Sequence, residues 1–205
     1  MINMLIQTKT DIENIANEII ELYEKFGNED YIGEPVSQIE HMCQCAQLAW
    51  KNGANETVVL AAFFHDIGHL CEFQFPEKGL KHMDKFGIID HEKLGAEFLR
   101  QKGFSEQLAR LVENHVHAKR YLVYKYESYA QQLSEASKQT LIHQGGPMTE
   151  TEAAEFEKDE LFHEIIALRK WDELAKETNR PLPSLVVYKT MMIAHLSNLH
   201  SINLH

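Results

Sequence analysis

The stretch from Val58 to His69, VVLAAFFHDIGH, is apolar on every side of the helix it would form, yet it contains two histidines and an aspartate. A helix that is apolar all round has to lie in the interior of a globular protein, and Asn55 stands where it can cap its start. His65, Asp66 and His69 are therefore expected in the core. Burying an unpaired carboxylate is costly, so this helix predicts a core in which polar groups meet compensating partners.

The rest of the chain also has helical periodicity, and the alternation typical of strands is scarce. We expect an N-terminal helix over residues 10–27, opened by a Thr10/Glu13 capping box. The other expected helices lie at about Val36–Asn52, His91–Gly103, from Ser105 onward, at Tyr129–His143, after a Thr149/Glu152 capping box and after Ser184. The helix after Thr149 is expected to carry Asp172. Residues 70–90 are expected to form a lid-like loop.

A chain of 205 residues without repeats or linkers predicts a single domain, 1–205, of the all-α class. The net charge of −11 argues against a nucleic-acid partner, which would need a basic face. No stretch reaches the roughly 20 apolar residues that span a bilayer, and the N-terminus lacks signal-peptide features. Three cysteines form no disulfide framework, which favours the reducing cytoplasm. Cys43 and Cys45 would face apart on a helix and are expected to pack in the core. The oligomeric state stays open.

Several other histidines and acids lie on the same helical face as core residues. His91 shares a face with Leu94, His115 is in line with Leu108, and Asp172 follows Leu168. His41 precedes Cys45 by one turn. Six side chains therefore point inward: His41, His65, Asp66, His91, His115 and Asp172.

Any one of these residues alone would be read as a satisfied core histidine or a capped acid. Six together, including a contiguous His-Asp pair, favour a metal site instead, because coordination removes the cost of burying the carboxylates and of crowding the imidazoles. The imidazole can serve one ion while the adjacent carboxylate bridges two. Nitrogen and carboxylate ligands without thiolate suit iron, manganese or zinc.

The order His41, His65-Asp66, Asp172 resembles the H…HD…D pattern of the HD-domain superfamily, and His91 and His115 match its dinuclear branch. That branch includes phosphohydrolases and iron oxygenases. Other segments resemble a narrower family, the HD-domain mixed-valent diiron oxygenases related to 2-amino-1-hydroxyethylphosphonate dioxygenase. The similar segments are DYIGE at 30–34, QIEH at 38–41, HDIGH at 65–69, HEKLGA at 91–96, HVHAKRYL at 115–122, QGGPM at 144–148 and RKWD at 169–172. Several of them have no metal-ligand role, so this match is more specific than the HD pattern.

This resemblance implies an all-α HD-domain bundle that holds two iron ions, Fe(II)/Fe(III), on the six inward residues, with O2 as co-substrate. Oxygen bound at the metals would cleave the carbon–phosphorus bond of a 1-hydroxy-2-aminoethylphosphonate-type substrate. Phosphate and a carboxylic acid, such as glycine or an N-substituted glycine, would be released. Tyr31 would ligate iron in the substrate-free state, and Tyr31 and Glu34 would gate the site. The substrate-binding residues implied by the family are Glu34, His69, Lys119, Ser137 and Arg169.

The residues themselves are compatible with these roles. Lys119 lies one turn after His115, and Arg169 lies three residues before Asp172, so both cations can stand beside the metals and hold a phosphonate. The segment after His69 departs from the family pattern by its length and by three phenylalanines, Phe73, Phe75 and Phe86. Aromatic rings favour a bulkier, even quaternary, ammonium group, or they simply pack the lid.

Three functional hypotheses follow. The first is the diiron oxygenase. The second is a dinuclear metal-dependent phosphohydrolase that activates water for attack on a small phosphate ester or nucleotide. The third is a helical domain that its metals only stabilise. The Tyr31/Glu34 pair favours the first, because an acid beside an anionic substrate suits an aminophosphonate zwitterion better than a plain phosphate ester.

Overall fold

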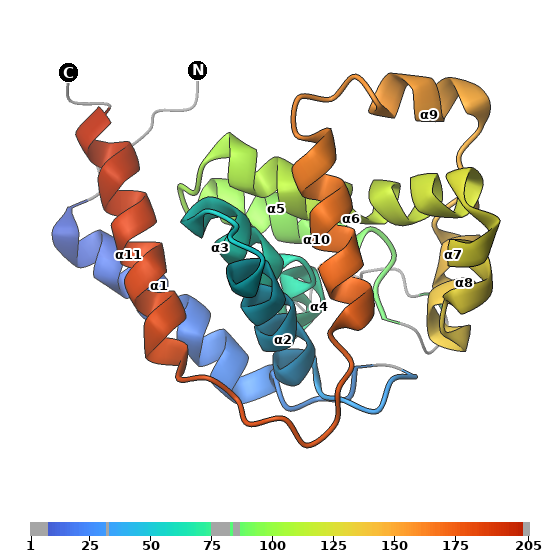
Figure 1. Ribbon diagram of the computed structural model, residues 1–205. Coiled ribbons are helices and arrows are strands. Elements are labelled where there is room, and N and C mark those ends of the chain that lie inside the picture. The colour runs from blue at the N-terminus through green and yellow to red at the C-terminus, as the bar shows by residue number, and fades with distance from the viewer. Residues whose placement is uncertain (1–7, 32, 75–82, 84–86, 203–205) are drawn as a thin grey trace.

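The computed structural model describes residues 8–31, 33–74, 83 and 87–202, and it confirms the all-α prediction (Figure 1). The described residues form no strand, and an isolated bridge pairs Asp30 with Ser37. The helices are α1 Lys9–Phe26, α2 Gln38–Lys51, α3 Glu56–Phe64, α4 Ile67–Gln74, α5 His91–Gln101, α6 Glu106–Lys125, α7 Glu127–Gln132, α8 Glu135–His143, α9 Glu150–Phe156, α10 Phe162–Leu174 and α11 Leu185–Ile202.

Helix α3 lies at the centre of the bundle, as its apolar sequence predicts. It packs against α2, α6, α10 and α11, and every residue from Val58 to Phe64 is buried. Asn55 caps it by accepting a hydrogen bond from the Val58 N–H at 3.0 Å. In Figure 1, α1 and α11 lie side by side along one flank of this core, and α7 and α8 lie on the opposite flank.

The single helix expected through Val58–His69 is wrong in one respect, because the chain turns at His65 and Asp66 and α4 starts at Ile67. The turn lets α4 pack closely on α5, where a Cβ on Gly68 would stand 1.9 Å from the His91 carbonyl oxygen. The prediction of a loop over 70–90 is wrong for residues 70–74, because they continue α4. Phe75, Phe86 and most of that segment lie outside the described residues.

Three further boundaries differ from expectation. The first capping box is formed by Thr8 and Asp11, not by Thr10 and Glu13. The helix expected over Tyr129–His143 is divided into α7 and α8, because the Ser134 side chain caps a new helix. The Thr149/Glu152 box does form, but it opens the short α9, and Asp172 lies on the separate α10.

No helix in the described part of the chain is long and apolar enough to cross a membrane. Cys43, Cys45 and Cys71 are all buried, so the expectation that the first two pack in the core is confirmed.

Candidate metal centre

The six inward residues come together in the middle of the bundle. His41 comes from α2, His65 and Asp66 from the turn between α3 and α4, and His91 from the first position of α5. His115 lies on α6 and Asp172 on α10. None of the six is more than 4% exposed. Five separate stretches of the chain thus place polar groups at one buried point.

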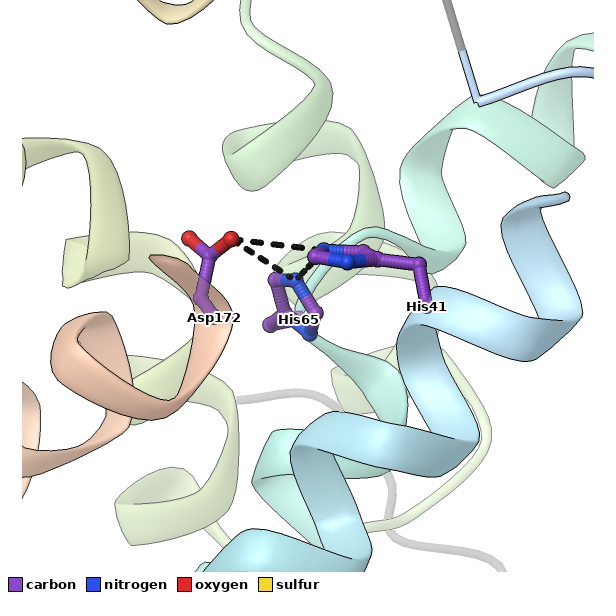
Figure 2. A group of neighbouring side chains, drawn as sticks. All are labelled: His41, His65 and Asp172. Carbon is purple, nitrogen blue, oxygen red and sulfur yellow. Dashed lines mark hydrogen bonds and ion pairs between the residues drawn. The ribbon is translucent and has the colours of Figure 1, made fainter. Parts of the chain in front are cut away.

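These residues form two groups of potential ligands, each with its donor atoms within 4.8 Å of one another. The first group is His41, His65 and Asp172 (Figure 2). The two imidazoles approach through their Nε2 atoms, 3.0 Å apart, and the Asp172 Oδ1 lies 3.3 Å from the Nε2 of His41. Three donor atoms therefore surround a common point.

The second group is Asp66, His91 and His115. Asp66 Oδ1 lies 3.2 Å from the Nε2 of His91 and 3.4 Å from that of His115. Its other oxygen, Oδ2, faces the first group at 3.4 Å from the Nε2 of His65. The Asp66 carboxylate is therefore placed to bridge two ions.

The outer nitrogens of three of these histidines are held by backbone carbonyl groups. The Nδ1 atoms of His41, His65 and His115 lie 2.9, 2.8 and 2.7 Å from the carbonyl oxygens of Ala175, Ala62 and Val112. A carbonyl can only accept, so each Nδ1 carries the proton and each Nε2 presents a lone pair to the centre. This is the arrangement of metal-ligating histidines in proteins.

Lone pairs that face each other at about 3 Å repel unless a proton or a metal ion lies between them. The Asp172 Oδ1 is buried and has no hydrogen-bond partner, which is also costly without a cation. Burial alone would raise the pKa of Asp172 and Asp66, but Arg169 beside Asp172 and, without metal, a protonated His65 beside Asp66 lower it well below the usual range, and a metal ion would take the place of that imidazole proton. Both carboxylates are therefore ionised, and the donor set fits two divalent or trivalent metal ions.

A pocket opens beside the two groups. All the substrate-contact residues that the sequence predicts line it, as does Tyr31: Tyr31, Glu34, His69, Lys119, Ser137 and Arg169. The pocket also includes Asp66, His91, His115 and Asp172. A small molecule in this pocket would therefore contact the basic side chains of Lys119 and Arg169 as well as the candidate metal ligands.

Two buried cations stand in this pocket. Lys119 is 4% exposed and donates to the Thr140 hydroxyl at 2.9 Å. Burial and the charge of Arg169 lower the pKa of Lys119 to about 7. Arg169 is also 4% exposed and donates to Asp172, to Glu173 and, at 2.8 Å, to the Tyr129 hydroxyl. Such a pair suits a phosphonate group, because the negative charge of a bound phosphonate would raise the pKa of Lys119 again and keep it protonated.

Tyr31 and His69 each stack on a candidate ligand. The Tyr31 ring lies on His41 with centroids 4.0 Å apart, and the His69 ring lies on His91 at 4.1 Å. Burial and the carboxylates of Asp66 and Asp172 raise the pKa of Tyr31 well above its usual value, so only a nearby metal ion would favour the phenolate. His69 Nδ1 accepts from the Ile88 N–H at 3.4 Å, so the ring proton is on Nε2.

Glu34 differs from expectation in its surroundings. It follows a turn in which its N–H bonds the Tyr31 carbonyl at 2.8 Å, and its carboxylate is bound by Ser134 and Lys176. Lys176 and Glu173 were not predicted from the sequence, although Glu173 lies on α10 beside Asp172 and Lys176 follows the end of that helix at a spacing of three. The spacing 169, 172, 173, 176 is the signal that could have revealed them.

Comparison with known proteins places these residues in a family. The model of the HD domain matches residues 39–184. An uncharacterized protein of Acanthamoeba polyphaga mimivirus is 45% identical over 91% of this chain and 83% of its own length. A glycine-betaine-forming dioxygenase of Leisingera caerulea, named for 1-hydroxy-2-(trimethylamino)ethylphosphonate, is 41% identical over 86% of this chain and 87% of its own. A hydroxymethylphosphonate dioxygenase of Gimesia maris is 35% identical over 92% and 90%.

Proposed function

This chain belongs to the HD-domain phosphonate oxygenase family, and on that premise we propose that it is a diiron dioxygenase that cleaves the carbon–phosphorus bond of a 1-hydroxy-2-aminoethylphosphonate-type substrate. The reaction consumes one O2. The hydroxyl-bearing carbon leaves as a carboxylic acid, glycine or an N-substituted glycine, and the phosphorus leaves as inorganic phosphate. Atoms balance without a further reductant.

The observation that carries this proposal is the position of the Asp66 carboxylate between the two groups of potential ligands and beside the buried side chains of Lys119 and Arg169. Asp66 presents one oxygen to each group of ligands, and Lys119 and Arg169 line the same pocket. The six residues His41, His65, Asp66, His91, His115 and Asp172 would hold the two iron ions. In the Fe(II)/Fe(III) state the pair would supply the redox chemistry with O2.

The protein's own side chains bind and orient the substrate. Lys119 and Arg169 pair with the phosphonate oxygens, and Arg169 stays fixed by its bonds to Asp172 and Tyr129. The His69 Nε2–H and the Ser137 hydroxyl are additional donors in the pocket. These contacts would hold the hydroxyl-bearing carbon against the metal pair, and the buried pocket would exclude water from the reacting bond.

Tyr31 and Glu34 would control access to the site. The Tyr31 ring covers His41, so it occupies the side of the first metal group that faces the pocket. Its hydroxyl would ligate the iron until substrate arrives. Glu34, three residues on in the same turn, would then meet the amino end of the substrate.

The test is phosphate release from a panel of phosphonates and phosphate esters, with iron-loaded protein, in the presence and absence of O2. We expect phosphate from a 1-hydroxy-2-aminoethylphosphonate in a one-to-one ratio with O2 consumed, and isotope from 18O2 in the carboxylate product. Anaerobic turnover of a phosphate ester, with no O2 uptake on any hydroxyphosphonate, would replace the oxygenase with the HD phosphohydrolase.

A further inference from the structure

A row of alternating charges connects Glu34 to the metal centre. Lys176 donates to Glu34 at 2.9 Å and to Glu173 at 3.1 Å. Arg169 donates to Glu173 and to Asp172. The row therefore reads acid, base, acid, base, acid, from Glu34 at one end of the pocket to Asp172 among the potential ligands.

The Glu34 end of this row is largely shielded from water. The Glu34 side chain is 8% exposed and that of Lys176 is 15% exposed. The Ser134 hydroxyl also donates to the same carboxylate oxygen, Oε1, at 2.5 Å. A buried ion pair of this kind is coupled far more strongly than a surface pair. The charge of Glu34 is thus already paired before any substrate is bound.

This pairing bears directly on which substrates the pocket favours. An ammonium group that approaches Glu34 has to share the carboxylate with Lys176, so it gains less than it would from a free carboxylate. A substrate without an ammonium group meets a neutral pair instead of a bare negative charge. Lys176 keeps Glu173 as a partner when Glu34 turns to a ligand, so releasing Glu34 does not leave a buried lysine alone.

We propose that Lys176 is a specificity-determining residue, which neutralises Glu34 and so sets how strongly the pocket prefers phosphonates that carry a cationic amine over those that do not. Lys176 does not line the pocket, so it acts through Glu34 and not on the substrate. This inference rests on the proposed function, because it assigns the phosphonate to Lys119 and Arg169 and the amine to Glu34.

The experiment compares two ligands that differ at the amine end, 2-aminoethylphosphonate and ethylphosphonate. Both lack the 1-hydroxyl group and should not turn over, so their affinities for the iron-loaded protein can be measured by calorimetry without O2. In Lys176→Met, 2-aminoethylphosphonate should bind more tightly and ethylphosphonate more weakly than in the parent. The preference for the amine, measured as the ratio of the two dissociation constants, should therefore increase by about 10-fold or more. Lys176→Arg, which keeps the charge, should leave the ratio close to that of the parent.

A double variant separates this effect from a general disturbance of the fold. In a Glu34→Gln background no carboxylate is present to neutralise, so Lys176→Met should no longer change the ratio. A ratio that is unchanged or reversed in Lys176→Met, while both ligands bind the parent, overturns the role of Lys176 and leaves the proposed function standing. If neither ligand binds the parent, the inference fails, and O2-dependent phosphate release from a 1-hydroxy-2-aminoethylphosphonate then decides separately whether the proposed function stands. Should Lys176→Met not fold, Lys176→Gln provides the same comparison.

Discussion

Asp66 is the residue on which both halves of the centre depend, because its two oxygens face different groups of ligands. Replacing it with alanine removes the bridge but leaves two donors in the second group and three in the first. We expect Asp66→Ala to retain about one iron per chain instead of about two, and to lose the magnetic coupling between the ions. Metal analysis and electron paramagnetic resonance measure both. Two coupled iron ions in the variant would contradict the bridging role.

A second prediction concerns Tyr31 as an iron ligand in the substrate-free state. If its hydroxyl ligates ferric iron, Tyr31→Phe should keep both metals and lose the visible absorption of a phenolate bound to iron. The ring stacked on His41 is retained by phenylalanine, so packing should change little. The check is an absorption spectrum of parent and variant in the same Fe(II)/Fe(III) state. Identical spectra would exclude Tyr31 as a ligand.

The buried position of Lys119 favours phosphonate binding but lowers the free energy of unfolding of the protein. Its pKa is about 7 in the fold against 10.5 as the ordinary value. Between these two values the unfolded chain binds more protons, so the parent gains stability as pH rises. Lys119→Met should therefore raise the free energy of unfolding of the metal-free protein at pH 7 by roughly 2–4 kcal/mol, after the lost bond to Thr140 is allowed for.

This advantage of Lys119→Met should shrink as pH rises from 7 towards 10, which urea unfolding at several pH values can follow. The same variant should bind phosphonates about 10- to 150-fold more weakly, because it loses one charge-assisted contact. A variant that is no more stable than the parent at pH 7 would show that Lys119 is not held at a cost in the fold.

At the level of elements, the close approach of α4 to α5 fixes where His91 stands. A Cβ on Gly68 would meet the His91 carbonyl oxygen at 1.9 Å and its carbonyl carbon at 2.7 Å, and both are backbone atoms that cannot swing away. Gly68→Ala should therefore lower the free energy of unfolding by about 1–3 kcal/mol and reduce metal binding by the second group.

Gly53→Ala is the matched control for this variant. Gly53 has a φ of +77°, so alanine there is strained, but nothing lies within 4 Å of the new Cβ. It should cost about 1–2 kcal/mol in thermal or urea unfolding and leave the iron content unchanged. Equal iron content in both variants would show that helix spacing at Gly68 does not position His91.

The elements also show where sequence patterns are sufficient. The central position of helix α3 was predictable, because a helix that is apolar on every side is stable only in the core. The turn at His65 and Asp66 was not, because nothing local ends a helix there, and the turn follows from how α4 packs on α5 through Gly68 and Gly95. The split between α7 and α8 depends on a single cap at Ser134, which competes with a continuous helical pattern.

For the whole molecule, the six candidate ligands could be predicted because each lies on an inward face of its own helix, and inward faces converge in a bundle. The spacing 169, 172, 173, 176 could have placed Lys176 near Arg169, but the pairing of Lys176 with Glu34 could not be predicted in this way. It depends on how the chain leaves α10 and passes beside the turn at Tyr31, a contact across 142 positions that no periodicity records.

The centre joins parts of the chain from His41 to Asp172, so metal binding and the stability of the bundle should be coupled. The buried Asp172 oxygen without a partner and the facing imidazole nitrogens each favour the metal-bound state over the empty one. An ion at 100 times its dissociation constant stabilises the fold by about 2.7 kcal/mol. Two ions should therefore raise the melting temperature of a chain of this size by about 10–20 °C.

Removal of iron with a chelator should reverse this shift, and added iron should restore it in a concentration-dependent way, which calorimetry can follow. In Asp66→Ala the shift should fall to about half, because only the first group keeps all its donors. The helical content measured by circular dichroism should change little on removal, since α3 and its neighbours retain their apolar contacts. A melting temperature that is unaffected by the loss of both ions would mean that the centre contributes nothing to holding α2, α5, α6 and α10 together.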